Sequence, residues 1–315
     1  MAAMRLASQL GEQFDSAIRA RTRDVDVVSI ASGVPEALPM DIDAMIALPF
    51  LQSGQVAPTK PAGWPFGLKW IQLVSVGADL YPDWLFEGPV VSCARGATSD
   101  ALAEFALAAI FAAAKNMPNI WIDAIDDWKH QGIGMVRGST LGIVGFGGIG
   151  AALAPRALAL GMSVIATRRT DALFGIDGVE RAESLTDLFA RSDHVVLAAP
   201  ATAETRGMIS AEVLSHAKQG LHLINLARGI LIDDDALLAA LDRRQLSLAS
   251  LDVTHPEPLP ADHPFYRHPQ IRVSPHVAVM TNEVGGALLD KLTANLDRVA
   301  RGQAPEDIVD LNRGY

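Results

Sequence analysis

Residues 141–150 read Leu141-Gly142-Ile143-Val144-Gly145-Phe146-Gly147-Gly148-Ile149-Gly150. The apolar run at 141–144 predicts a buried strand, and residues 151–160 have the pattern of a helix, so the glycines fall at the turn between the two. At such a turn Gly145 allows a tight bend, Gly147 lets a pyrophosphate approach the backbone, and Gly150 lets the helix pack closely on the strand. The positive end of the helix would face the phosphates. This arrangement predicts a dinucleotide-binding domain built on a doubly wound parallel sheet.

The next predicted strand, Ser163–Thr167, ends where a dinucleotide-binding domain usually carries an acidic residue for the ribose 2′-hydroxyl. This chain has Arg168 and Arg169 at that place. A carboxylate would repel a 2′-phosphate, whereas two guanidiniums bind one through charge-assisted hydrogen bonds. We therefore expect NADP as the cofactor, with NADPH preferred over NADH. The alternative is that both arginines are solvated residues at a strand end.

Composition limits the classes of partner. Half of the 315 residues are hydrophobic and the formal net charge is -10, so the chain is long enough for two cores and its field repels nucleic acid and anionic membranes. The most apolar segment, Ala101–Ala114, is too short to span a bilayer. The single cysteine, Cys93, provides no disulfide framework and favours a reducing compartment. We expect a cytoplasmic protein that binds no nucleic acid and no membrane.

Short apolar runs alternate with helical or polar stretches along the chain, which is the α/β pattern. In the first hundred residues the predicted strands are Val25–Ile30, Ala44–Leu48, Trp70–Val76 and Val90–Ala94. A loop rich in proline and glycine, Pro49–Gly67, separates two of them, and a long apolar helix begins near Ser99. Later strands are predicted at His194–Ala198, His222–Leu226, Leu248–Val253 and Ile271–Val273, with helices at 234–243 and 282–301.

Three residues with reactive side chains, Arg228, Glu257 and His276, follow the last three of these strands. Since ligands of doubly wound sheets bind beyond the carboxyl ends of the strands, we expect the three side chains to converge. A guanidinium can hold a carboxylate, an imidazole can donate a proton to the neighbouring carbonyl oxygen, and a glutamate can orient the imidazole. These residue types suit the reversible reduction of a 2-keto acid, for which a nicotinamide supplies the hydride.

The chain resembles the D-isomer-specific 2-hydroxyacid dehydrogenase family over nearly its whole length, and its pattern is closest to the NADP-using glyoxylate/hydroxypyruvate reductases. Besides the glycine turn, the segments that carry the resemblance are Pro200 with Glu204-Thr205 and Gly207, Ile224-Asn225-Leu226-Ala227-Arg228-Gly229, Leu251-Asp252-Val253 with Glu257-Pro258-Leu259, and Ser274-Pro275-His276-Val277-Ala278. By this resemblance the catalytic residues are Arg228, Glu257 and His276. The residues expected at the cofactor are Gly145, Gly147, Gly148, Ile149, Gly150, Thr167, Arg168, Arg169, Ala199, Pro200, Ala227 and Asp252.

The resemblance also implies two α/β domains with a cleft between them. A Rossmann nucleotide-binding domain would occupy residues 100–280, and residues 1–99 with 281–315 would form a flavodoxin-like substrate-binding domain. Val76 and Gly77 match the family's loop whose backbone amides hold the substrate carboxylate. Trp64 either shapes a substrate pocket or packs the loop around it. Because such enzymes are commonly dimers joined through the nucleotide domain, we expect a homodimer.

The sequence leaves the substrate and two other functions open. Glyoxylate or hydroxypyruvate is expected first, and larger 2-keto acids such as phenylpyruvate next. The fold also resembles corepressors that bind nicotinamide cofactors, so a dinucleotide-sensing interaction protein is one alternative, and a phosphite dehydrogenase-like enzyme is another. Prolines break the spacing of His255, His263 and His268, so these histidines share no helical or hairpin face and we expect no metal site.

Overall fold

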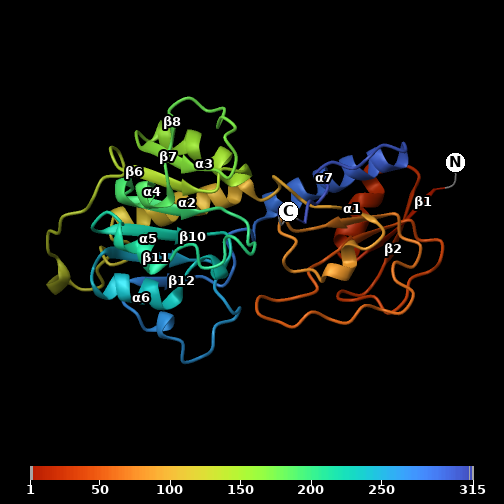
Figure 1. The fold of residues 1–315 in the computed structure, drawn as a ribbon, viewed down its shortest axis with the longest axis horizontal. Coiled ribbons are helices and arrows are strands. Elements are labelled where there is room, and N and C mark those ends of the chain that lie inside the picture. The colour runs from red at the N-terminus through yellow and green to blue at the C-terminus, as the bar shows by residue number, and fades with distance from the viewer. Residues whose placement is uncertain (1–2, 312, 314–315) are drawn as a thin grey trace. The chain divides into compact units, whose positions relative to one another are not determined.

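The structure is a computed structural model that describes residues 3–311 and 313. The predicted domain ranges also include residues 1, 2, 312, 314 and 315, which lie outside the described residues. The chain divides into two compact units. We call Ser99–Met280 the continuous unit, and Met1–Thr98 together with Thr281–Tyr315 the split unit. Each unit is built on a parallel sheet (Figure 1), so the predicted class of two parallel-sheet α/β domains is confirmed.

Seven strands form the sheet of the continuous unit, in the order β12-β11-β10-β9-β6-β7-β8, and every pair is parallel. Their bounds are β6 Thr140–Val144, β7 Ser163–Thr167, β8 Val179–Arg181, β9 His194–Leu197, β10 Leu221–Asn225, β11 Leu246–Leu251 and β12 Ile271–Val273. The chain builds outward from β6 to β8 and then continues with β9 on the other side of β6. The strand order therefore reverses between β6 and β9, and ligands of such sheets bind at this reversal.

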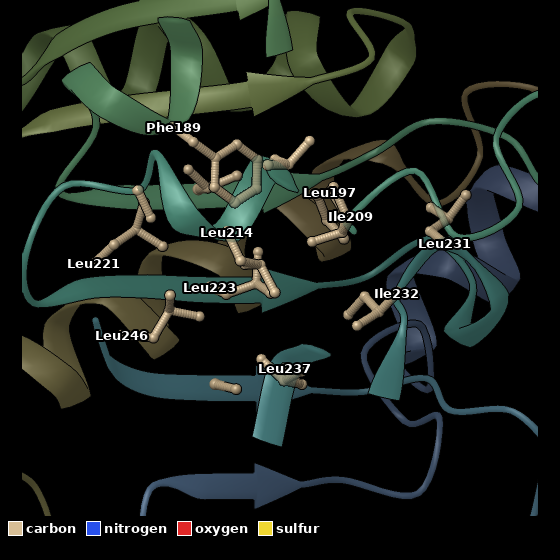
Figure 2. Packing of buried hydrophobic residues seen from close by; sticks show 14 of the residues in the cluster. Phe189, Leu197, Ile209, Leu214, Leu221, Leu223, Leu231, Ile232, Leu237 and Leu246 are labelled. Atoms are coloured by element: carbon tan, nitrogen blue, oxygen red, sulfur yellow. The ribbon is translucent and has the colours of Figure 1, made fainter. Parts of the chain in front are cut away.

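Helices cover both faces of this sheet. They are α2 (Ser99–Ala114), α3 (Gly148–Ala159), α4 (Leu185–Arg191), α5 (Ala211–Ser215) and α6 (Asp234–Asp242). Ile143 packs in one apolar cluster with α2 and α3, whereas the next residue, Val144, packs in the other cluster with α4, α5 and α6. Figure 2 shows the second cluster, with Leu223 of β10 among the apolar side chains. Because successive side chains of a strand point to opposite faces, strands covered on both sides are apolar throughout, as the sequence shows them.

The segment between α2 and β6 lies outside these layers (Figure 1). Residues 117–135, which we call the arm, contain only a short 3-10 turn at Ile125–Asp127. The arm exposes large apolar side chains, among them Trp121 at 68%, Ile125 at 80% and Trp128 at 70% of their surface. Such a concentration of exposed apolar surface marks a site of interaction more often than a free surface.

Five parallel strands form the sheet of the split unit, in the order β2-β1-β3-β4-β5. They are β1 Met4–Ser8, β2 Val25–Ser29, β3 Ala44–Ala47, β4 Trp70–Leu73 and β5 Val90–Ser92. Helices α1 (Glu12–Arg21) and α7 (Asn282–Ala300) pack on one face, where Ile18 and Leu292 contact the cluster of Leu6 and Trp70. The other face is covered by irregular chain, including residues 49–67, and not by long helices.

The structure differs from the predictions at the N-terminus, at element ends, and in the continuous unit, where the sequence analysis did not predict β8, α4 or α5. The sequence analysis did not predict β1 or α1, although β1 lies between β2 and β3 in the sheet. β4 ends three residues earlier than predicted, at Leu73, and α3 begins three residues earlier, at Gly148. Among the residues that the structure describes, no helix combines the length and apolar character needed to cross a bilayer.

Candidate active site

The glycine turn joins β6 to α3 with a backbone that only glycine tolerates. Gly145 has φ +91°, and a Cβ at this position would lie 2.7 Å from the backbone of Ala199. A side chain there would therefore clash with the residues that follow β9. At Gly147, by contrast, a Cβ would meet nothing within 4 Å. The turn thus leaves open space directly before the helix N-terminus, which fits the predicted pyrophosphate site of a dinucleotide.

The arginine pair follows β7 at the same edge of the sheet, since Val144 is paired with Thr167. The Arg168 guanidinium donates a hydrogen bond to the Leu173 carbonyl oxygen at 3.2 Å. Among the described residues, neither Arg168 nor Arg169 forms an ion pair with a carboxylate. Arg169 does act on Glu204 at longer range, since its positive charge contributes to lowering the pKa of that carboxyl. Two guanidiniums beside a dinucleotide turn have the chemistry to hold a phosphate.

Arg228 stands in a turn that its neighbours hold. The fully buried Asn225, at the end of β10, accepts a hydrogen bond from the Ala227 N–H at 3.1 Å and donates one to the Arg228 carbonyl at 2.8 Å. The following Gly229 presses on the adjacent loop, because a Cβ there would lie 2.0 Å from the Thr254 carbonyl carbon. The backbone after β10 therefore lies directly against the backbone after β11.

Glu257 and His276, predicted to act together, are hydrogen bonded. The His276 Nδ1 lies 3.0 Å from Glu257 Oε2. Because an ionised carboxylate only accepts, Nδ1 carries the proton and Nε2 is the ring nitrogen that can exchange a proton with a ligand. The other oxygen of Glu257, Oε1, accepts the Thr254 N–H at 2.9 Å. Both carboxylate oxygens are thus fixed, and the imidazole is held in one orientation.

Electrostatics favours the ionised form of Glu257. Burial acts to raise the pKa of its carboxyl. The hydrogen bonds from His276 and the Thr254 N–H, together with the positive charge of Arg228, lower the pKa by more than burial raises it, so it lies below its ordinary value. A carboxylate that stays charged stabilises a protonated imidazole. The pair is therefore suited to general acid–base chemistry.

Asp252 holds the segment that carries His276. Its carboxylate is 2% exposed and accepts hydrogen bonds from Ser274 Oγ at 2.6 Å and from the N–H groups of Val277 and Ala278 at 3.0 Å each. His276 itself has φ +53°, a conformation that costs a non-glycine residue free energy and persists only where the surroundings enforce it. The prediction placed Asp252 at the nicotinamide; the geometry adds the task of fixing this strained turn.

The remaining predicted cofactor residues lie near the same edge. Ala199 and Pro200 follow β9, and the Pro200 carbonyl accepts a hydrogen bond from Thr205 Oγ1 at 2.7 Å. Gly148, Ile149 and Gly150 form the first turn of α3. The sheet registers bring the ends of β6, β7, β9, β10, β11 and β12 to one edge. The predicted residues of the continuous unit are therefore brought together.

In the split unit, Val76 and Gly77 follow β4 and lie in an irregular turn, where Ser75 Oγ donates a hydrogen bond to the Gly77 carbonyl at 2.9 Å. Trp64 is 8% exposed and packs edge-on against Phe66 and Trp84. Of the two interpretations of Trp64, this geometry supports the one in which it packs the loop. The loop is ordered because its aromatic side chains cover one face of the sheet.

Asn225 and Thr254 are positioning residues that the sequence analysis missed. Each is buried, at 0% and 7% exposure, and each uses a backbone or side-chain hydrogen bond to fix a reactive residue. Polar residues at strand ends resemble ordinary turn residues in a sequence, so only their burial distinguishes them. Among the described residues, no group of three or more His, Cys, Asp or Glu side chains could hold a metal ion.

Comparisons with known proteins identify relatives of this chain. A family model described as D-isomer specific 2-hydroxyacid dehydrogenase, NAD binding domain, matches residues 107–278. Glyoxylate/hydroxypyruvate reductase A of Serratia proteamaculans is 38% identical over 179 residues, which cover 56% of this chain and 56% of that protein. The match thus spans little more than half the length of that relative. Glyoxylate reductase of Thermofilum pendens is 32% identical over 255 residues, 77% of this chain and 75% of the relative.

A solved structure resembles the whole chain. The D-isomer specific 2-hydroxyacid dehydrogenase of Xanthobacter autotrophicus Py2, in complex with NADPH and MES, is 26% identical, covers 100% of both chains and gives a TM-score of 0.81. The predicted family is confirmed by the family model and the more complete relative together. The chain belongs to the D-isomer-specific 2-hydroxyacid dehydrogenase family.

Proposed function

We propose that this enzyme transfers a hydride between NADPH and a small 2-keto acid to give the D-2-hydroxy acid. The observation that carries the proposal is the hydrogen bond between His276 Nδ1 and Glu257 Oε2, 3.0 Å long, at the sheet edge that also holds the glycine turn. A structural histidine would not need a half-buried, ionised partner at that edge. We assign the continuous unit to the dinucleotide and the split unit to the substrate.

The chemistry follows from three side chains. Arg228 would bind the substrate carboxylate and polarise the adjacent carbonyl. His276 would donate the proton on Nε2 to the carbonyl oxygen, while Glu257 stabilises the imidazolium needed for that step. A bound nicotinamide would supply the hydride. In the reverse direction His276 takes the proton back from the hydroxyl group.

Loss of His276 tests this assignment. We expect His276→Ala to reduce turnover by roughly two to four orders of magnitude, the usual scale for a general acid, while cofactor affinity stays near normal. His216→Ala is a matched control, because His216 is exposed at the end of α5. Equal turnover of the His276 variant and the parent would contradict the role of His276. Absence of turnover in the parent itself would instead support the alternative of a dinucleotide-sensing protein.

The preference for NADPH is supported by Arg168 and Arg169, which directly follow β7. The double variant Arg168→Asp, Arg169→Ala should weaken the binding of NADPH by up to a few kcal/mol and the binding of NADH much less. The reason is that charge-assisted hydrogen bonds contribute about 1.5–3 kcal/mol each. Binding is measured by quenching of protein fluorescence. Equal losses for both cofactors would exclude the arginines as the phosphate-binding residues.

We propose glyoxylate or hydroxypyruvate as the first substrates to test, and phenylpyruvate as a larger one. The first choice is supported by the names of the relatives from Serratia proteamaculans and Thermofilum pendens. The experiment is a spectrophotometric panel of keto acids with NADPH and NADH, and with phosphite and NADP in the reverse direction. Turnover of phosphite alone would favour the phosphite dehydrogenase-like alternative.

We also propose a homodimer formed through the continuous unit. Its support is the exposed arm and a groove of about 640 Å³ that begins at the base of the arm, at Met117, and runs between α2 and β11–β12. In a two-fold dimer the same surfaces meet reciprocally, so the arm of each subunit can lie in the groove of the other subunit.

Replacing Trp121 and Trp128 with serine should convert a dimer into a monomer of 33.5 kDa in light scattering. A Tyr266→Ser variant, altered at an exposed aromatic residue outside the arm, serves as control. A parent protein that is monomeric at micromolar concentration would contradict the proposal. The expected cytoplasmic location stays a prediction.

A further inference from the structure

We propose that Arg181 is a positioning residue for recognition of the ribose 2′-phosphate: it fixes the loop that carries Arg168 and Arg169. The inference rests on the proposed NADPH preference and adds a residue outside the set expected at the cofactor. Arg181 is the last residue of β8, and the loop is the connection from β7 to β8, residues 168–178.

The Arg181 guanidinium binds the loop through its backbone. One terminal nitrogen donates a hydrogen bond to the Thr170 carbonyl at 3.3 Å, and the other donates to the Ala172 carbonyl at 2.6 Å. The same guanidinium lies over the Phe174 ring, 4.8 Å from its centre. A planar fork suits this combination of two acceptors and one aromatic face, and the ammonium group of a lysine does not.

Apart from Phe174 and Ile176, which are partly buried against the apolar cluster of α2 and α3, the loop is exposed. Residues 168–178 form no helix or strand, and Leu173 exposes 89% of its surface. The carbonyls of residues 170, 172 and 173 all accept bonds from arginines, two from Arg181 and one from Arg168. A loop with only two partly buried apolar side chains depends on such contacts for the conformation of its exposed part.

Phe174 connects this loop to the glycine turn. Its ring lies 4.5 Å, centre to centre, from the ring of Phe146, at an angle of 51°. Phe146 lies between the first two glycines of the turn and is 5% exposed. A Cβ on Gly150 would lie 3.0 Å from the Phe146 ring. Arg181 therefore links two segments: the turn expected to bind the pyrophosphate and the arginine pair expected to bind the 2′-phosphate.

Charge alone does not explain these contacts. Among the described residues, Arg181 forms no ion pair, and its hydrogen-bond acceptors are neutral carbonyls. A positive charge at the end of β8 would also attract a phosphate from a distance, but that effect needs no fork and no aromatic stack. The two roles predict different behaviour for a lysine at this position, which makes them separable.

The experiment compares the binding of two cofactor fragments, 2′,5′-ADP and 5′-AMP, by calorimetry. We expect Arg181→Ala to weaken the binding of 2′,5′-ADP roughly tenfold and the binding of 5′-AMP by less than about twofold. A tenfold loss corresponds to one lost charge-assisted contact. Arg181→Lys should behave like the alanine variant. Arg191→Ala is the matched control, since Arg191 pairs with Glu180 and Asp187 and does not contact the loop. Hydrogen exchange of a peptide spanning residues 168–178 should become faster in both Arg181 variants and not in the control.

Three results would overturn the inference. The first is unchanged exchange of the loop in Arg181→Ala, and the second is an equal loss of affinity for both fragments. The third is recovery of binding in Arg181→Lys, which would assign the effect to charge. The parent protein separately tests the proposed function: if it binds 2′,5′-ADP no better than 5′-AMP, the NADPH preference is wrong and the inference falls with it. If the parent discriminates and Arg181→Ala does so equally well, only the role of Arg181 is wrong.

Discussion

Replacing Asp252 with asparagine tests whether this residue acts mainly by holding the His276 segment. The carboxylate is 2% exposed, and its oxygens accept bonds from Ser274 Oγ, the Val277 N–H and the Ala278 N–H. An asparagine amide keeps one carbonyl oxygen. With that oxygen toward Ser274 and Val277, its NH₂ group faces the Ala278 N–H, so two donors oppose each other in a buried place.

The expected cost follows from these bonds. One lost bond with an unsatisfied buried donor costs about 1–3 kcal/mol, and the two bonds that remain lose their charge assistance. The opposite amide orientation loses two bonds and is worse. For a domain of this size 1 kcal/mol shifts Tm by about 2–4 °C, so the transition of the continuous unit should fall by roughly 5–10 °C. Turnover should fall with it, because the strained turn at His276 is no longer enforced.

Differential scanning calorimetry and steady-state kinetics on the same preparation check this prediction. Asp242→Asn is the control, since Asp242 is an exposed residue at the end of α6 whose carboxylate lies 3.4 Å from His268 Nε2. A Tm that stays within about 1 °C of the parent, with a large loss of cofactor affinity, would refute the reasoning. That result would show that Asp252 acts through the nicotinamide and not through the turn.

Three further changes have defined outcomes. Gly229→Ala places a Cβ 2.0 Å from the Thr254 carbonyl carbon, so the loops must separate; we expect a loss of about 1–3 kcal/mol of stability in urea unfolding and a fall in kcat/KM. Burial and the neighbouring His194 lower the pKa of His222 from 6.5 to about 3. Between these two pH values the unfolded state binds more protons than the folded state, so the stability falls as the pH drops. His222→Gln should therefore reduce the loss of Tm between pH 7 and pH 5, and an unchanged pH dependence would contradict this expectation. The pKa of Glu257 is lowered from 4.5, so its stabilisation is present above that pH and is lost as the pH falls through the folded value; Glu257→Gln should therefore lower Tm at neutral pH and have a smaller effect in acid.

Six of the seven strands of the continuous unit were predicted, because both faces of its sheet are buried; the exposed edge strand β8 was not. Ser163–Thr167 and Ile271–Val273 have the predicted bounds, and the strand between Leu221 and Asn225 is displaced by one residue. The N-terminal strand Met4–Ser8 was missed because its five residues form a weak signal, although tertiary pairing places it inside a sheet. Its position depends on β2 and β3, which a local pattern cannot report.

The reactive residues were predictable from the sequence, whereas the residues that position them were not. Arg228, Glu257 and His276 carry chemistry that a sequence displays directly, and their positions after strands place them at one edge. The support from Asn225 and Thr254 depends on hydrogen bonds to segments that only the folded chain brings close. Trp64 was left between two interpretations for the same reason, because an aromatic residue in a loop reveals neither what it covers nor what it faces.

The groups that hold Arg228, Glu257 and His276 in place contact one another in a connected series, so the effects of substitutions in them are not independent. The turn of Arg228 contacts the loop of Thr254 through Gly229, the Thr254 N–H binds Glu257, and Glu257 binds His276, whose turn Asp252 holds from the other side. Gly229→Ala and Asp252→Asn therefore act on the same hydrogen bond from opposite ends. Substitutions that share a partner do not add. Once either change has displaced His276 from Glu257, the other has less left to remove, so the loss of turnover in the double variant should be smaller than the product of the two single losses. A full product would mean that the two loops support the reaction independently, and that the series of contacts is structural only.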